Sequence, residues 1–119
     1  MEYKVFDSEL KVMEVLWKEG DLSAAQISKI LYDKIGWNRN TTYTVIMKLV
    51  KKGAIKRSKT GYMCKALITK DQVRVHQAEE LLGKLFDGSV GLLLSAFVND
   101  KELSDGEVKQ LKELVQKHM

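Results

Sequence analysis

The sequence predicts a mainly helical protein with one small β-hairpin, the α+β class, organised in two parts. Over residues 1–70, three amphipathic helical patterns precede two short extended runs that are joined by a tight turn. Over residues 71–119 the pattern is helical and carries no hairpin signal. We therefore expect an N-terminal domain, residues 1–70, followed by a C-terminal domain of three helices, residues 71–119.

The first three helices are delimited by residue types that favour helix ends. Each expected start has a side chain that accepts hydrogen bonds from the free amides of the first turn. These residues are Asp7 or Ser8 for the first helix, Ser23 with Gln26 for the second, and Asn38 for the third. Each expected stop has a glycine, which readily adopts the left-handed conformation of a helix end. The glycines are Gly20, Gly36 and Gly53.

The hairpin is expected from residues 54–58 and 62–67, two extended runs separated by residues 59–61. Gly61 supplies the positive φ that a tight turn needs. A single hairpin is only marginally stable alone, so it must dock on the helices. Three helices followed by a hairpin is the order of a winged helix-turn-helix domain, in which the hairpin forms the wing.

The C-terminal part contains more apolar side chains than so short a segment can bury by itself. Helices are expected over about 71–86, over 89–99 and from Ser104 onward. Each Leu or Phe left exposed would forgo about 1.5–3 kcal/mol, so burial against a second copy of the chain is expected. The residues expected at this dimer interface are Leu81, Leu82, Leu85, Phe86, Leu92, Leu93, Phe97, Leu111 and Leu114. The alternative is that these helices fold back onto the N-terminal domain of the same chain.

The net charge of +4 hides an uneven distribution. Residues 1–70 carry +7 and residues 71–119 carry −3. Ten basic residues and no carboxylate fall between Lys34 and Lys70. Because each cation placed on a phosphate releases condensed counterions, such a window indicates a polyanionic partner, which for a winged helix is double-stranded DNA. The alternative is a merely basic loop region.

The third helix is expected to bury Val45, Ile46, Leu49 and Val50 and to present its other face to the major groove of DNA. The residues expected to reach base edges are Asn40, Thr41, Thr44 and Lys48, with Arg39 and Tyr43 at the flanks. Long cationic side chains suit phosphates, which add affinity without sequence information. These are Lys51, Lys52, Lys56, Arg57, Lys59 and Lys65. Tyr62 either contacts the DNA backbone or braces the hairpin.

The sequence carries no catalytic motif, phosphate-binding glycine loop or metal-ligand spacing, so no enzyme, cofactor or metal site is expected. Its only cysteine, Cys64, cannot form an intramolecular disulfide. A redox role for Cys64, with Lys65 lowering its pKa, is a weaker alternative. No run approaches the roughly 18 apolar residues of a membrane helix, and the N-terminus lacks a signal-peptide core. We therefore expect a cytoplasmic protein without membrane insertion.

Several segments resemble the penicillinase and methicillin-resistance repressors of bacteria, the BlaI/MecI/CopY type. In the first part these are residues 10–17 (LKVMEVLW), 37–42 (WNRNTT) and 49–55 (LVKKGAI). In the second part they are residues 85–89 (LFDGS), 96–98 (AFV), and 103–104 (LS) with Glu107. The resemblance implies a homodimeric transcriptional repressor that binds a palindromic operator. It also implies that Asn40, Thr41, Thr44 and Lys48 occupy the positions that contact the operator.

The resemblance further implies that repression is relieved by proteolysis after a signal from a membrane sensor, or by a metal, depending on the branch. The Asn-Phe bond that is cut in the antibiotic-responsive branch is matched here by Ala96-Phe97. The cysteine-rich hook of the copper-responsive branch has no counterpart in residues 114–119. The wing, usually Gly-Arg and ending in Tyr-x-Pro, reads Gly61-Tyr62 and then Ala66-Leu67-Ile68. Cleavage at Ala96-Phe97 by a regulatory protease is therefore one expected route among these.

Two other functions fit a winged helix. One is a protein-interaction module that docks an acidic protein, although an interaction helix more often exposes aromatic residues or leucines than threonines. The other is a repressor switched by a small-molecule or metal ligand, for which the sequence shows no convergent polar groups. The carboxylate-free window and the exposed threonines favour operator binding over both.

Overall fold

A computed structural model describes residues 4–100, 104–107, 109, 110 and 113, without the side chains of residues 97–100. The elements in chain order are α1 (Asp7–Glu19), β1 (Leu22–Ser23), α2 (Ala24–Ile35), α3 (Arg39–Lys51), β2 (Ile55–Arg57), β3 (Met63–Ala66), α4 (Lys70–Leu85) and α5 (Val90–Asp100). The chain forms two compact units, residues 1–76 and 77–119, whose boundary falls inside α4.

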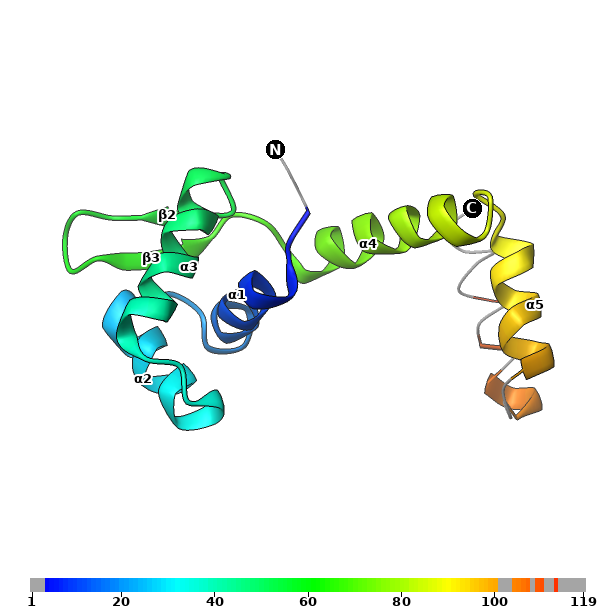
Figure 1. Ribbon diagram of the computed structural model, residues 1–119, viewed down its shortest axis with the longest axis horizontal. Coiled ribbons are helices and arrows are strands. Elements are labelled where there is room, and N and C mark those ends of the chain that lie inside the picture. Colours follow the sequence, from blue (N-terminus) through cyan, green and yellow to red (C-terminus); the bar gives the residue numbers. More distant parts are fainter. Residues whose placement is uncertain (1–3, 101–103, 108, 111–112, 114–119) are drawn as a thin grey trace. The chain divides into compact units, whose positions relative to one another are not determined.

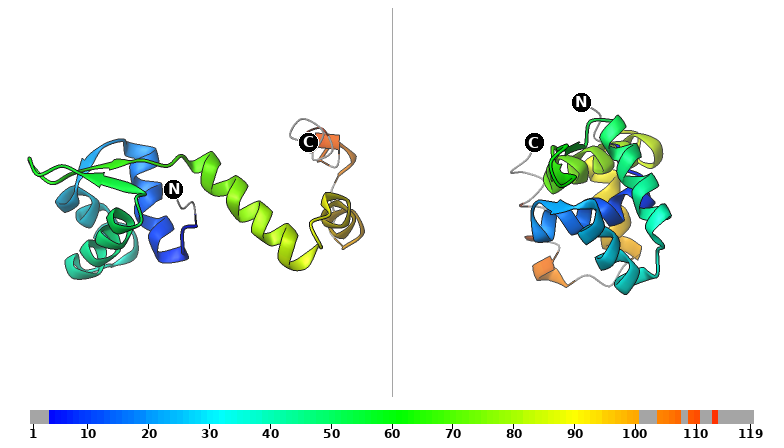
Figure 2. Two further views of the ribbon diagram at one scale, coloured as in Figure 1. Left: turned by 90° about the horizontal axis from the view of Figure 1, so that it is seen from above. Right: turned by 90° about the vertical axis from the view of Figure 1, so that its left-hand side faces the viewer.

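The first unit is built from three helices and a three-stranded antiparallel sheet. The helices α1, α2 and α3 pack against one another, and α1 and α3 also contact the sheet (Figure 1). The strand order is β1-β3-β2, with Leu22 opposite Cys64 and Arg57 opposite Cys64 on the other side. The turn between β2 and β3 projects away from the helices in Figure 1 and in the left view of Figure 2. The expected combination of helices and a wing is confirmed.

The core of this unit includes Val45, Ile46 and Leu49 from the predicted inward face of α3, whereas Val50, also predicted to be buried, is only half-buried. The fully buried members of the core come from all three helices and both hairpin strands, and the largest are Met13, Ile27, Ile46, Leu49, Ile55 and Ile68. Trp17 and Trp37 are half-buried and pack against this core. The indole Nε1 of Trp17 donates a hydrogen bond to the backbone oxygen of Ile68 at 3.0 Å. This bond joins α1 to the segment that follows the hairpin.

The caps predicted for the second and third helices are confirmed. Ser23 Oγ accepts a hydrogen bond from the Gln26 amide at 3.1 Å, and Gln26 Oε1 accepts one from the Ser23 amide at 2.9 Å. Asn38 Oδ1 accepts from the Thr41 amide at 2.8 Å. These bonds satisfy first-turn amides that have no partner inside the helix.

The cap predicted for the first helix was wrong. The residue before α1 is Phe6, not Asp7 or Ser8, and its amide donates to Glu9 Oε1 at 2.9 Å. Both predicted cap residues lie inside the helix, where the negative charge of Asp7 is favoured near the positive end of the helix dipole. The carboxylate of Glu9 occupies the capping place because tertiary contacts hold it there, as described below.

The strand β1 was not predicted. It has only two residues, too few for an alternating pattern, and it exists because it pairs with β3. The backbone amide of Ala24 then donates to the Tyr62 oxygen at 3.3 Å, which continues the contact beyond the strand. The wing is therefore attached to the start of α2 and not only to α3.

The turn of the wing holds two successive residues in the left-handed conformation. Gly61 has φ +69°, as the sequence predicted, but Tyr62 also has φ +51°. A residue with a side chain disfavours this conformation, so the surrounding contacts must hold it in place. The hydrogen bond from the Ser58 amide to the Met63 oxygen, 2.9 Å, closes the turn.

Over the continuously described residues up to 100, the wing is followed by α4 and α5. A capping box that the sequence analysis missed opens α4, in which Thr69 Oγ1 accepts from the Gln72 amide and Gln72 Oε1 accepts from the Thr69 amide. Asp87 and Gly88, both with positive φ, lie between α4 and α5. The predicted box at Ser104 and Glu107 is confirmed, with the Glu107 amide 3.2 Å from Ser104 Oγ. Leu111 and Leu114 lie outside the described residues.

Candidate nucleic-acid interface

The exposed face of α3 carries the side chains predicted to read bases. Asn40, Thr41, Thr44 and Lys48 are all exposed, while Thr42, Val45, Ile46 and Leu49 are buried on the opposite face. Its 13 residues span about 20 Å, and the major groove of B-DNA is wide enough to admit an α-helix. The face has no carboxylate, because none occurs between Lys34 and Lys70.

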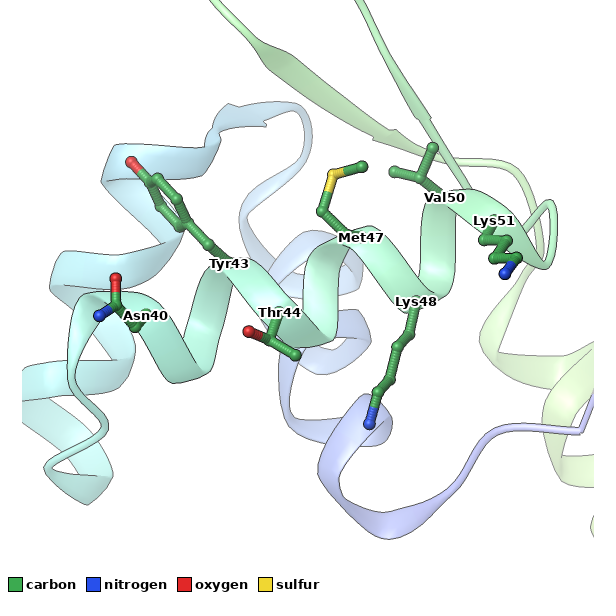
Figure 3. A pocket seen from close by; sticks show the side chains of 7 residues that line it. All are labelled: Asn40, Tyr43, Thr44, Met47, Lys48, Val50 and Lys51. Carbon is green, nitrogen blue, oxygen red and sulfur yellow. The ribbon is translucent and has the colours of Figure 1, made fainter.

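A shallow hollow of about 670 Å³ runs along this face (Figure 3). The residues that line it are Asn40, Tyr43, Thr44, Met47, Lys48, Val50 and Lys51. Thr44 and Lys48 point to one side of the helix, and Tyr43, Met47 and Val50 point to the other, where Met47 and Val50 lie next to the strands (Figure 3). The structure thus places a polar row and an apolar row side by side.

Met47 is part of this face, although the sequence pattern did not single it out. Its side chain is 44% exposed, so it does not belong to the core. An apolar residue in an amphipathic helix is ordinarily assigned to the buried face, which is why it was passed over. The signal was nevertheless present, since Met47 follows the exposed Asn40 by seven positions, about two helical turns, which aligns these two residues along α3.

A second hollow, of about 550 Å³, lies between the start of α2 and the wing. It is lined by Ser23, Ala24, Ala25, Arg39, Tyr43, Arg57, Gly61 and Tyr62. Arg39 Nε donates to the Tyr43 hydroxyl at 3.1 Å, and the Arg57 guanidinium lies 5.2 Å from the centre of the Tyr62 ring. Two guanidinium groups and the positive end of a helix dipole therefore surround one hollow.

The structure gives Lys52 a different position from the other predicted phosphate contacts. Its Nζ lies 2.7 Å from Glu9 Oε1 and donates to the Lys4 backbone oxygen at 3.0 Å. It also lies 4.9 Å from the centre of the Phe6 ring. The side chains of Lys52 and Glu9 are only 14% and 4% exposed. Lys52 thus fastens the end of α3 to the start of α1.

The remaining predicted cations point into solvent. Lys51, Lys56, Lys59 and Lys65 are exposed, and none of them forms a salt bridge with another described residue. Arg57 is also exposed, and its Nη1 donates to Met47 Sδ at 3.3 Å. Arg57 thereby connects the wing to α3.

Cys64 is fully buried in the middle strand of the sheet. Burial raises the pKa of its thiol above the usual range, and the nearby Arg57 charge offsets only part of that rise. The lowering by Lys65 that the sequence suggested is not the charge effect found. Within the residues that the structure describes, no group of three or more His, Cys, Asp or Glu is placed to hold a metal ion.

The described helices include none that is long and apolar enough to cross a membrane. Three packed helices, a hairpin attached to both α2 and α3, and a basic face on the third helix define a winged-helix domain. Comparison with known proteins agrees with this class.

A model of the penicillinase repressor family matches residues 6–117. The penicillinase repressor of Bacillus licheniformis is 25% identical over 97% of this chain and 91% of that protein. The methicillin resistance regulatory protein MecI of Staphylococcus aureus (strain N315) is 26% identical over 97% of this chain and 95% of that protein. The solution structure of the DNA-binding domain of the repressor BlaI superposes with a TM-score of 0.52 and 30% identity, over 58% of this chain and 87% of that domain.

The chain therefore belongs to the penicillinase repressor family, as its sequence motifs indicated. This is a family of non-enzymatic regulators, which agrees with the absence of a catalytic function expected from the sequence. The protein is a transcriptional repressor with a winged-helix domain.

Proposed function

We propose that this repressor binds a palindromic operator as a homodimer, with α3 in the major groove and the wing over the adjacent backbone. The observation that carries the proposal is the exposed face of α3, where amide, hydroxyl and ammonium groups stand without a single carboxylate. A polyanion can approach this face without like-charge repulsion. The similarity to the DNA-binding domain of the repressor BlaI supports the same assignment.

Base reading is assigned to the polar row of α3. Asn40 has the amide needed for a bidentate bond to adenine, the methyl groups of Thr41 and Thr44 fit thymine methyls, and Lys48 suits guanine.

Duplexes selected from a genomic library would reveal the operator. Thr44→Ala should then relax discrimination at one base position per half-site by about 1–3 kcal/mol. Unchanged discrimination at every position would show that α3 does not read the operator through this face.

Phosphate contacts are assigned to the exposed cations of α3 and the wing and to the hollow at the start of α2. Arg39 and Arg57 face that hollow from two elements, and the positive end of the α2 dipole favours an anion. Binding should therefore weaken steeply with salt, by about 0.9 in log K per phosphate contact for each unit of log salt. A salt-independent affinity would contradict this assignment.

Dimerisation is assigned to the C-terminal domain, residues 71–119. Its described part exposes large apolar side chains on both helices, with Leu85 71% and Leu92 51% exposed. Leu81 is also exposed, and Leu82, Phe86 and Leu93 are half-buried. A second copy would cover these surfaces and would bring two winged-helix domains to the two halves of a palindrome.

Relief of repression by proteolysis at Ala96-Phe97 is the regulatory part of the proposal. This bond lies within α5, the helix assigned to the dimer contact. Cutting it would separate the two DNA-binding domains and abolish the avidity of a two-site contact. Immunoblotting of induced cells tests this route, because an intact chain under relieved repression would exclude it. Operator binding requires the protein in the cytoplasm.

A further inference from the structure

The apolar row beside the polar row of α3 has no place in a description based on hydrogen bonds and phosphates. Tyr43 and Val50 are half-buried, so only their edges reach the surface. Met47 stands between them and is 44% exposed. In an isolated domain this exposure costs free energy, since an apolar side chain gains from removal from water.

The position of Met47 is fixed by the wing. Arg57 Nη1 donates to Met47 Sδ at 3.3 Å, and the same guanidinium lies over the Tyr62 ring. Methionine is otherwise a flexible side chain, so this contact restricts where its terminal methyl group can lie. The side chain points from α3 toward the strands, with Thr44 and Lys48 pointing the other way (Figure 3).

The major groove presents one apolar group, the C5 methyl of thymine. Every other base edge there displays hydrogen-bond donors or acceptors, which an exposed thioether and methyl group would leave unsatisfied. An apolar side chain at the centre of the exposed face of α3 is therefore complementary to one base only, thymine.

We propose that Met47 is a specificity-determining residue that receives a thymine C5 methyl group in the hollow beside α3, with Arg57 holding its sulfur in place. The inference rests on the proposed operator binding and adds to it the identity of one base per half-site.

The test removes the apolar group from either side of the contact, the thymine methyl on the DNA or the thioether of Met47 on the protein. Each thymine of the selected operator is replaced in turn by deoxyuridine, which keeps all hydrogen-bonding groups and lacks only the methyl. Affinities are measured for the wild type, for Met47→Ala and for Met47→Leu. The matched control is Met63→Ala, which truncates a methionine of similar exposure, 39%, on the wing strand β3.

At one position per half-site, deoxyuridine should weaken wild-type binding about fourfold, as expected for losing the burial of one methyl-sized group. For Met47→Ala the same replacement should change nothing, so that the double-mutant cycle shows coupling. Met47→Leu keeps an apolar contact, so its affinity should still fall when that thymine is replaced by deoxyuridine. The affinity of Met63→Ala should fall in the same way. Because Met47 is exposed and alanine favours helix, the truncated variant should fold normally.

The inference is overturned if Met47→Ala is as sensitive as the wild type at every thymine, or if neither half-site contains thymine. Either result leaves operator binding intact. The proposed function itself fails only if the wild type selects no duplex, so the two failures are distinguishable.

Discussion

Lys51 and Lys52 are neighbours in the chain, yet they occupy different environments. Lys51 is exposed and lines the hollow on α3, whereas Lys52 is nearly buried and bound to Glu9. Both were predicted to contact phosphates, because sequence shows charge and not the direction in which a side chain leaves the helix. We expect only Lys51 to act on DNA directly.

The two lysines therefore give a matched pair of variants. Lys51→Ala should reduce the slope of log K against log salt by about 1 and should change stability by no more than about 0.5 kcal/mol. Lys52→Ala leaves the Glu9 carboxylate buried without its partner and should lower the free energy of unfolding by about 3 kcal/mol. Its salt slope should equal that of the wild type. Urea denaturation and binding titrations measure the two effects, and a reduced slope for Lys52→Ala would contradict the assignment.

Cys64 is expected to be chemically inert in the folded protein. Alkylation requires the thiolate, and burial raises the pKa of this thiol, so the thiolate fraction near pH 7–8 falls below that of a free cysteine. Iodoacetamide should react with Cys64 much more slowly in buffer than in denaturant, as followed by mass spectrometry. Equal rates in the two solvents would contradict the burial and would revive a sensing role.

Among the elements, the start of α2 has two tasks. Its capping box stabilises the helix, and its first turn lines the hollow that also holds Arg39 and Arg57. β1 and the bond from the Ala24 amide to the Tyr62 oxygen tie the wing to the same place. Substitutions at the start of α2 should therefore be able to change the stability of the fold and the affinity for DNA independently.

Two substitutions of Ser23 separate the tasks. Ser23→Ala removes the cap acceptor and should lower the free energy of unfolding by about 1 kcal/mol, with little change in the DNA affinity of the folded protein. Ser23→Asp keeps an acceptor and should preserve stability, but it places a carboxylate where we expect a phosphate. Its DNA affinity should fall at least several-fold, with the largest loss at low salt. Wild-type affinity for Ser23→Asp would move the phosphate contact elsewhere.

For the whole molecule, the proposed binding to a palindromic operator requires two winged helices held by one dimer. The exposed leucines of α4 and α5 are the surfaces that we expect to be covered. Affinity for a palindrome then depends on residues that never touch DNA, because the second half-site binds at a high effective concentration.

Leu85→Glu should convert the dimer to a monomer, since a carboxylate at the interface would be desolvated without a partner. Sedimentation velocity measures the change in mass. Affinity for a two-site duplex should fall about 100-fold or more, while affinity for a single half-site should stay the same. Tyr32→Glu, an equally drastic change at a 64% exposed position on α2, serves as the control and should remain dimeric. A dimeric Leu85→Glu would place the interface elsewhere.

Sequence alone determined the features that depend on local chemistry. The caps at Ser23 and Asn38, the glycine stops and the buried stripe of α3, apart from the half-buried Val50, follow from short-range hydrogen bonds and helical spacing and are present. The basic window and the family motifs then identified the class of protein. Each of these signals lies within a few residues of the feature that it predicts.

Tertiary structure decided what depends on residues far apart in the chain. Glu9 caps the first helix because Lys52, 43 positions away, holds its carboxylate. The strand β1 exists because β3 pairs with it. Met47 lies on the exposed face of α3, where it contacts Arg57, ten positions away. Packing between distant segments fixes these positions, and a local pattern of residue types does not contain the geometry that brings such segments together.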